Sequence, residues 1–300
     1  MNSPTSGKDF ERFRRSGMTT GTTHAIGAGF VAARTRVASF LIRLGVRPNH
    51  VTLAGFAVTL LAAGCFVVGA GHHAPYEQAI AGVPRSFWPL LAAMFLILAG
   101  ACDMLDGAVA RLGGSGTKFG GVLDSTLDRL CDIAVYLGMG IHFAWIGNVT
   151  YVTLAILAMC HGYMISYVKA RAEEYVDDCS VGYWLRGERV AGLLIACLCF
   201  HLPAWLWLQA TAPVGTVLRR LWHAHAVLRA EARGEPVRPA TARKGVLSAI
   251  LRGDCPRGSV AYDLVTGTTI VSYVVAPWIH PFFYGGSDPL RSLLSGVMGG

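Results

Sequence analysis

Hydrophobic residues in this chain form long runs separated by short polar segments, a pattern typical of membrane proteins. Six runs approach the roughly 20 apolar residues that a membrane-spanning helix needs. They lie near residues 51–71, 88–110, 121–146, 150–168, 190–208 and 205–222. A seventh apolar stretch, 260–284, contains Pro277 and Pro281 and is compatible with a span, a re-entrant segment or an interfacial segment. The pattern predicts an all-α integral membrane protein with about six transmembrane helices.

The segment before the first run has a different pattern. Apolar residues recur among arginines over residues 22–45, which predicts an amphipathic helix lying in the membrane interface. The residues before it are polar and basic and lack the apolar core of a cleavable signal peptide.

Composition and charge support this topology. The chain of 300 residues is 53% hydrophobic and 15% charged, with a net charge of +8. Lysine and arginine concentrate before the first run and in every second loop, whereas the alternate loops 72–87 and 147–150 hold only Arg85. The positive-inside rule therefore places the N-terminus and the loop after residue 110 in the cytoplasm. Because the basic residues follow the topology, we do not expect a nucleic-acid partner.

Four aspartates flank that cytoplasmic loop: Asp103, Asp106, Asp124 and Asp128. Carboxylates at membrane depth are costly, so they are interpreted as functional. The first two are three residues apart and the last two are four apart, so each pair shares one face of a helix. An all-oxygen set suits a hard divalent cation such as Mg²⁺ or Mn²⁺. The eight cysteines and the histidines show no zinc-ligand spacing, and disulfides are not expected.

Small residues accompany the first aspartate pair. Gly107 and Ala110 fall on the stripe of Asp103, and Arg111 lies a little further round the helix, where it can reach over that stripe. The missing side chains would let a flat or phosphorylated ligand lie against the backbone.

These residues together match D-x-x-D-G-x-x-A-R-x8-G-x-x-x-D-x-x-x-D at every fixed position from Asp103 to Asp128, including Gly120. The stretch resembles the signature of the CDP-alcohol phosphotransferases. The resemblance implies that the four aspartates hold two Mg²⁺ ions and that Asp128 is the base that deprotonates an acceptor alcohol. The alcohol would attack the phosphorus of a CDP-linked lipid such as CDP-diacylglycerol, and CMP would leave. The resemblance also implies a homodimer.

The resemblance extends to the start of the first run, where Pro48-Asn49-His50-Val51-Thr52 matches the family's P-N-x-V-T segment. From the residue types alone, this segment is a proline turn followed by a helix start. The implied nucleotide-binding residues are Pro48, Asn49, Thr52, Gly107, Ala110, Arg111 and Gly120.

A narrower resemblance concerns the acceptor. The stretch S-Y-V-K-A-R from Ser166 to Arg171, and the basic residues of R-G-E-R from Arg186 to Arg189, look like the branch that uses inositol phosphate. The implied acceptor-binding residues are Ser166, Lys169, Arg171, Arg186, Arg189 and Arg220. This chain has Leu185 where relatives often have glutamate, and Arg220 aligns only through the spacing from Thr216. Basic residues at the end of a span also snorkel toward the interface without binding a ligand. Glycerol phosphate or another alcohol therefore stays open as the acceptor.

Two other functions share some of these features. A membrane prenyltransferase would hold a diphosphate through Mg²⁺, but it needs two separate aspartate motifs. A divalent-cation transporter would explain the carboxylates, but not the small residues or Arg111. The phosphotransferase interpretation divides the chain into an arm and interfacial helix (1–46), a transmembrane catalytic domain (47–222) and a basic loop with an apolar extension (223–300).

Overall fold

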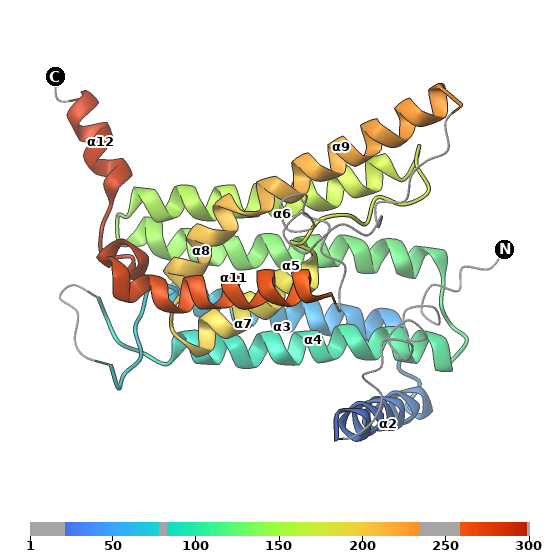
Figure 1. The fold of residues 1–300 in the computed structure, drawn as a ribbon. Coiled ribbons are helices and arrows are strands. Elements are labelled where there is room, and N and C mark those ends of the chain that lie inside the picture. Colours follow the sequence, from blue (N-terminus) through green and yellow to red (C-terminus); the bar gives the residue numbers. More distant parts are fainter. Residues whose placement is uncertain (1–21, 78–82, 235–258, 299–300) are drawn as a thin grey trace. The chain divides into compact units, whose positions relative to one another are not determined.

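The computed structural model describes residues 22–77, 83–234 and 259–298, and within these ranges every regular element is a helix (Figure 1). The elements in chain order are α2 (Thr22–Arg43), α3 (Pro48–Gly69), α4 (Trp88–Leu112), α5 (Lys118–Trp145), α6 (Val149–Ala172), α7 (Arg186–Leu198), α8 (Leu202–Thr211), α9 (Pro213–Ala232), α11 (Val260–Ile279), η1 (Pro281–Tyr284) and α12 (Pro289–Met298). The predicted fold class is therefore confirmed as all-helical.

Four of the described helices, α3, α4, α6 and α11, are long and apolar enough to cross a membrane. The seventh apolar stretch thus contains a helix of spanning length, with Pro277 near its end and Pro281 opening η1. Helix α5 is longer, at 28 residues, but it carries Asp124, Asp128 and Asp132. The segment at 22–45 is a helix, α2, and its position in the membrane interface stays a prediction.

The ranges 190–208 and 205–222 are not single continuous helices, so the predicted count of six spans is not confirmed. Helix α7 ends at Leu198, Phe200 adopts a positive φ of 56°, and α8 begins at Leu202. A second break precedes Pro213, the first residue of α9. Proline lacks a backbone N–H and is favoured in the first turn of a helix, which is where Pro203 of α8 and Pro213 of α9 lie. Hydropathy alone does not register these breaks.

The chain forms two compact units, and the boundaries between them fall within α3, α4 and α5. The first unit takes the described part of Met1–Gly55 together with Gly100–Leu127. Its small core joins Ala38 of α2 to Ala108 and Val109 of α4, with Leu41 and Ile42 packed against them.

The second unit takes Phe56–Ala99 and the described part of Asp128–Gly300, and it contains the larger core. Helix α6 packs against α8 and α9, and α11 contacts α7 and α8 (Figure 1). Two pairs of aromatic rings stack in this core, Tyr136 with Trp205 and Phe143 with Tyr151. At Gly138, an added Cβ would lie 2.5 Å from the carbonyl oxygen of Ala63, so glycine permits a close approach of α3 and α5.

One carboxylate in the second unit caps two helices. Asp288 accepts hydrogen bonds from the backbone N–H groups of Val149 (2.8 Å) and Thr150 (3.0 Å), at the start of α6. It also accepts from the N–H of Arg291, in the first turn of α12 (3.1 Å). Asn148 completes the α6 cap by accepting from Tyr151. These bonds satisfy N–H groups that lack partners within their helices.

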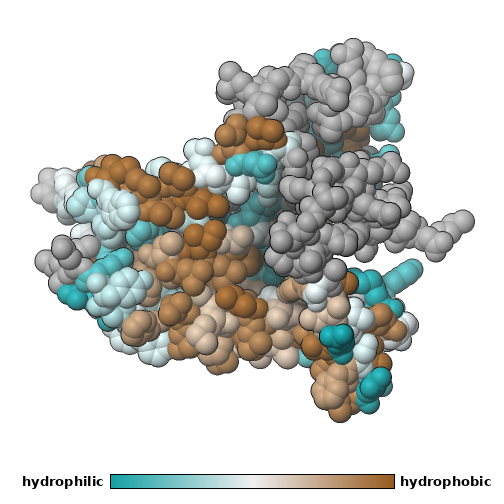
Figure 2. All heavy atoms as spheres, turned by 60° about the horizontal axis from the view of Figure 1, so that its bottom comes forward, coloured by the Kyte–Doolittle hydropathy of each residue, from teal (hydrophilic) through white to brown (hydrophobic). Residues whose placement is uncertain are grey.

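The described surface carries many exposed large hydrophobic side chains, and hydrophobic residues cover much of the face shown in Figure 2. Examples on α3 and α4 are Leu60, Leu61, Met94, Ile97 and Leu98. Such a surface suits contact with lipid rather than with water.

Candidate active site

The first unit brings together three of the predicted metal ligands. Asp103 lies near the end of α4 and Asp124 near the start of α5, and their nearest carboxylate oxygens are within 4.8 Å of each other. Asp106 is 8% exposed and accepts a hydrogen bond of 2.8 Å from the hydroxyl of Thr52 on α3. Like charges this close repel each other, and a divalent cation between them would remove the repulsion. The oxygen ligands fit a hard metal ion.

Asp128 follows Asp124 by four residues on the uninterrupted helix α5, so their side chains leave the helix on the same side. Asp128 belongs to the second unit, where its carboxylate lies 2.9 Å from the guanidinium of Arg186, the first residue of α7. The pair is partly exposed, at 22% for Asp128 and 32% for Arg186. The predicted base therefore contacts a predicted acceptor-binding residue.

The small residues of the motif lie as the sequence suggests. A Cβ on Gly107 would approach the guanidinium of Arg111 to 3.2 Å, so Arg111 folds back over the bare turn. Ala110 is half-buried on the same helix. A larger residue at position 107 would require the Arg111 guanidinium to shift.

The predicted nucleotide-binding residues outside α4 also meet within the first unit. Pro48 opens α3, where a proline ring suits the first helical turn. The side chain of Asn49 reaches α5, because a Cβ on Gly120 would lie 3.3 Å from the Asn49 amide oxygen. The N–H of Gly120 donates to the hydroxyl of Thr117 (2.9 Å), which fixes the start of α5.

In the second unit, Asp132 is a residue that the sequence analysis missed. It accepts from Arg189 Nη2 at 2.8 Å and lies 3.8 Å from Arg186. Its spacing could have identified it, since it continues the four-residue series of Asp124 and Asp128 along α5. Arg189 is only 3% exposed and also donates to the carbonyl of Trp184 (3.3 Å), so its contacts are with its own protein.

Arg220 is likewise buried, at 2% exposed, and donates to the carbonyls of Ile165 and Val181. Thr216, one turn earlier on α9, accepts from the N–H of Trp184 (3.2 Å). This pair of residues attaches the loop between α6 and α7 to α9. The contacts give Arg220 a structural role, and its acceptor-binding role stays a prediction.

The remaining predicted acceptor residues lie at the end of α6. Lys169 is 3.6 Å from Glu173, and Arg171 contacts Glu174 and the hydroxyl of Tyr175. Ser166 is half-buried one turn before Lys169. Both basic side chains are at least 40% exposed and could turn toward a ligand.

Lys169 also influences the loop that follows α6. Partial burial tends to raise the pKa of Asp178, but hydrogen bonds from Ser180 and the charges of Lys169 and His223 hold that pKa below its usual value. Burial of the Cys179 thiol raises its pKa, so this cysteine stays neutral near pH 7. The structure contains no disulfide among the cysteines that it describes.

These features define a helical membrane protein with an acidic, cation-compatible site on α4 and α5 and a basic group on α6 and α7. The sequence model of the family "CDP-alcohol phosphatidyltransferase" matches residues 45–228, more than half of the chain. The chain belongs to this family. It is an integral membrane enzyme that transfers a substituted phosphate group from a CDP-linked alcohol to an acceptor alcohol. The prenyltransferase and transporter alternatives are thereby set aside.

Individual relatives are similar over most of their length. The phosphatidylinositol phosphate synthase of Mycolicibacterium smegmatis is 35% identical over 227 residues, which cover 72% of this chain and 93% of the relative. Two crystal structures of phosphatidylinositol phosphate synthase from Mycobacterium tuberculosis match with 28% identity and a TM-score of 0.54. The one with manganese and citrate matches over 71% of this chain and 93% of its own, and the one with CDP-DAG bound matches over 71% and 98%.

Proposed function

We propose that the protein transfers the phosphatidyl group of CDP-diacylglycerol to an inositol phosphate, releasing CMP and forming a phosphatidylinositol phosphate. The observation that carries the proposal is the 2.9 Å contact between Asp128 and Arg186. It puts the proposed base next to a cation that can bind the phosphate of the acceptor. The names of the similar enzymes and the CDP-DAG bound in one of them support the choice of substrates.

Asp103, Asp106, Asp124 and Asp128 would hold two Mg²⁺ or Mn²⁺ ions. When bound, such ions offset the negative charge that develops on the attacking and leaving oxygens. Manganese in a similar structure and the oxygen-only ligand set support this assignment. Arg111, folded over Gly107, would contact a phosphate of the nucleotide, with Pro48, Asn49, Thr52, Ala110 and Gly120 around it.

The chemical step needs one proton transfer and one displacement. A carboxylate oxygen of Asp128 takes the proton of the acceptor hydroxyl, whose oxygen then attacks the phosphorus bonded to the lipid alcohol. A new phosphorus–oxygen bond forms to the acceptor, and the bond to the CMP phosphate breaks. An anionic acceptor would also compete with Asp128 for Arg186, freeing the carboxylate to act as a base.

The charge of the acceptor follows from the basic residues. A neutral alcohol does not need Arg186 and Lys169, whereas a phosphate gains charge-assisted hydrogen bonds of about 1.5–3 kcal/mol each. The positive-inside pattern supports a site that faces the cytoplasm, where phosphorylated metabolites are found. The homodimer implied by the family resemblance is part of this proposal.

The deciding experiment compares myo-inositol 1-phosphate, glycerol 3-phosphate and free myo-inositol as acceptors, with CDP-diacylglycerol and purified protein. We expect the inositol phosphate to be preferred and activity to require a divalent cation. Lys169→Ala and Arg186→Ala should raise the acceptor KM by on the order of tenfold, about 1.4 kcal/mol, and leave the KM of the CDP-lipid nearly unchanged.

Arg229→Ala is the matched control, because Arg229 is an exposed arginine on α9 to which no ligand is assigned. Preference for glycerol 3-phosphate would move the acceptor to that alternative. Equal use of free inositol, or full activity after exhaustive chelation, would contradict the proposal.

A further inference from the structure

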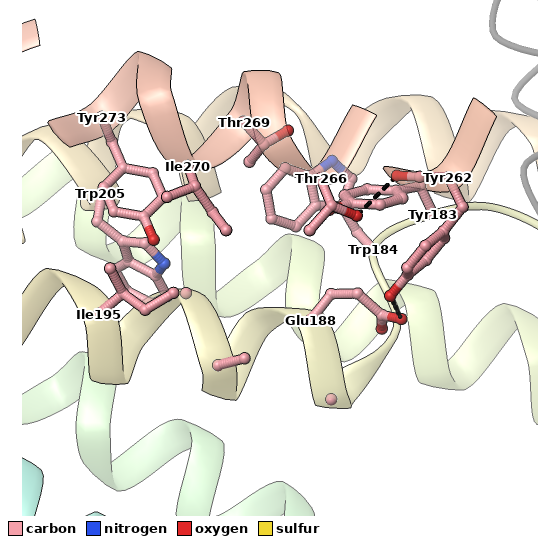
Figure 3. A pocket seen from close by; sticks show the side chains of 13 residues that line it. Tyr183, Trp184, Glu188, Ile195, Trp205, Tyr262, Thr266, Thr269, Ile270 and Tyr273 are labelled. Atoms are coloured by element: carbon pink, nitrogen blue, oxygen red, sulfur yellow. Dashed lines mark hydrogen bonds between the residues drawn. The ribbon is translucent and has the colours of Figure 1, made fainter. Parts of the chain in front are cut away.

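A cavity of about 180 Å³ lies in the second unit between α7, α8 and α11 (Figure 3). Helix α11 begins at Val260, beyond the region that matches the family. The wall supplied by α11 thus lies outside the part of the chain that the family model matches, and the described residues of the lining include none of the predicted site residues.

Most of the wall is apolar or aromatic. Ile195 of α7 and Ile270 of α11 face each other across the cavity, and Trp184 lies further along it (Figure 3). Exposed Gly187 and Ala191 belong to the same lining, so the cavity reaches the protein surface along α7. Such a wall suits a hydrocarbon chain that enters from the side.

Two buried hydrogen-bonding groups, on Trp205 and Tyr273, line the end of the cavity that is further from Trp184. Trp205 is 1% exposed and Tyr273 is 2% exposed, yet the indole Nε1 and the phenol oxygen make no hydrogen bond to any residue that the structure describes. Figure 3 shows these two side chains together at one end of the cavity. Buried tryptophan and tyrosine normally have hydrogen-bond partners, since an unsatisfied group is costly. A ligand oxygen between them would accept from the indole N–H.

The polar residues at the end of the cavity near Tyr183 and Tyr262 constrain the charge of the ligand. The hydroxyl of Tyr262 donates to the carboxylate of Glu188 (2.9 Å), and the hydroxyl of Tyr183 donates to that of Thr266 (3.1 Å). The described residues of the lining include the carboxylate of Glu188 but no lysine or arginine, so they offer no countercharge to a buried anionic head. A neutral oxygen is therefore favoured over a carboxylate or a phosphate.

The length of the cavity favours a chain. Its lining along α11 extends from Tyr262 to Tyr273, which is roughly 16 Å at 1.5 Å per residue. A cavity of this length and small volume is narrow. We propose that it binds one neutral, single-chain amphiphile, a long-chain alcohol or carbonyl compound, with its oxygen at Trp205 and Tyr273.

A photoreactive dodecanol with a diazirine near its methyl end tests this proposal on the full-length protein in detergent. Labelling should fall on peptides that line the cavity near Ala191 or Thr266, and excess unlabelled dodecanol should reduce it. Thr269→Phe, which adds a ring to the lining, should abolish this labelling. Val271→Phe is the matched control, because Val271 lies on α11 and is 60% exposed.

The hydrogen bonds are tested separately. Tyr273→Phe and Trp205→Phe should each weaken labelling by the alcohol by on the order of fivefold, while labelling by the matching alkane changes little. Equal labelling of Thr269→Phe and Val271→Phe, stronger labelling by the matching fatty acid, or labelling that unlabelled dodecanol cannot reduce would overturn the proposal. None of these results depends on the acceptor of the phosphotransfer reaction.

Discussion

The residues assigned to the nucleotide, together with Asp103, Asp106 and Asp124, belong to the first unit. The residues assigned to the acceptor belong to the second unit, as does Asp128, and the two groups are held differently. In the first unit, Asp103 and Arg111 are exposed, and the assigned set includes small residues such as Gly107. In the second unit, Arg189 and Arg220 are almost fully buried and bonded to the protein itself. The first arrangement keeps charged side chains exposed beside small residues, whereas in the second the arginines join the helices and loops to one another.

The acceptor-assigned residues are also divided among themselves. Arg186 and Lys169 keep part of their side chains exposed, Arg186 beside Asp128 and Asp132 and Lys169 beside Glu173. The side chain of Arg189 is buried and forms an ion pair with Asp132. Residues of one type within one short motif can therefore differ in role, and burial separates those that can bind a ligand from those that position them.

The largest expected effect is the loss of turnover when Asp128, the first residue after the unit boundary in α5, is replaced. Asp128→Asn removes the proposed base but keeps its shape, so kcat should fall by about 10²–10⁴-fold with little change in CDP-lipid binding. Steady-state kinetics and a binding assay with the CDP-lipid measure the two quantities. Arg186→Met, which breaks the same ion pair but keeps the carboxylate, should retain most of kcat at saturating acceptor. Near wild-type turnover in the aspartate variant would exclude Asp128 as the base.

The second effect separates the two arginines of α7. Arg189→Met leaves the carboxylate of Asp132 without its closest partner. Breaking a buried ion pair costs about 3–5 kcal/mol of folding stability. The cost should be smaller here, because the side chain of Asp132 is 20% exposed. Thermal unfolding in detergent should show a marked loss of stability. Arg186→Met should change stability by at most about 1 kcal/mol, because its pair is partly exposed. Unchanged stability with a raised acceptor KM in the Arg189 variant would make that residue an acceptor ligand.

The smallest effect lies in the second unit, at the double cap. Although burial favours the neutral form, hydrogen bonds from Thr150, Arg291 and Val149 hold the pKa of Asp288 below its usual 3.8. A lowered pKa means that the stabilisation is complete above about pH 4 and is lost as the pH falls through the lowered value. Asp288→Ala should cost about 0.5–2 kcal/mol at pH 7.

The comparison is the unfolding temperature of wild type and Asp288→Ala from pH 7 down to pH 3, with Asp177→Ala as an exposed-aspartate control. The difference between wild type and Asp288→Ala should shrink only at the acidic end of this range. A difference that is constant with pH would show that the charge of Asp288 does not stabilise the caps.

The sequence was most informative where the pattern is local. The helices α3 to α6 were predicted from their apolar runs, and the aspartates from their spacing, because helical periodicity alone brings such residues to one face. The position of Arg111 over Gly107 is local in the same sense. The resemblance to the family was first visible in the block from Asp103 to Asp128, and the family model matches the much longer range 45–228.

Features that depend on contacts distant in sequence were missed. Arg189, the ion-pair partner of Asp132, lies 57 residues away on α7. The interruption between α7 and α8 at Phe200 is marked in the sequence only by Pro203 nearby. The cavity beside α11 is formed by three helices, and its prediction requires their relative positions. The apolar residues of a helix do not indicate which other helix they contact. Burial is likewise a property of packing, so the sequence could not separate Arg186 from Arg189.

Helix α6 is held at both ends. Asp288 binds its first N–H groups, and Arg220 binds the carbonyl of Ile165 near its other end. Between these points the helix behaves as a stiff rod, with a total length of about 36 Å for its 24 residues. A rod clamped in this way transmits axial displacement without stretching. The depth at which Lys169 meets the aqueous phase is therefore set, in part, by a carboxylate at the far end of the helix.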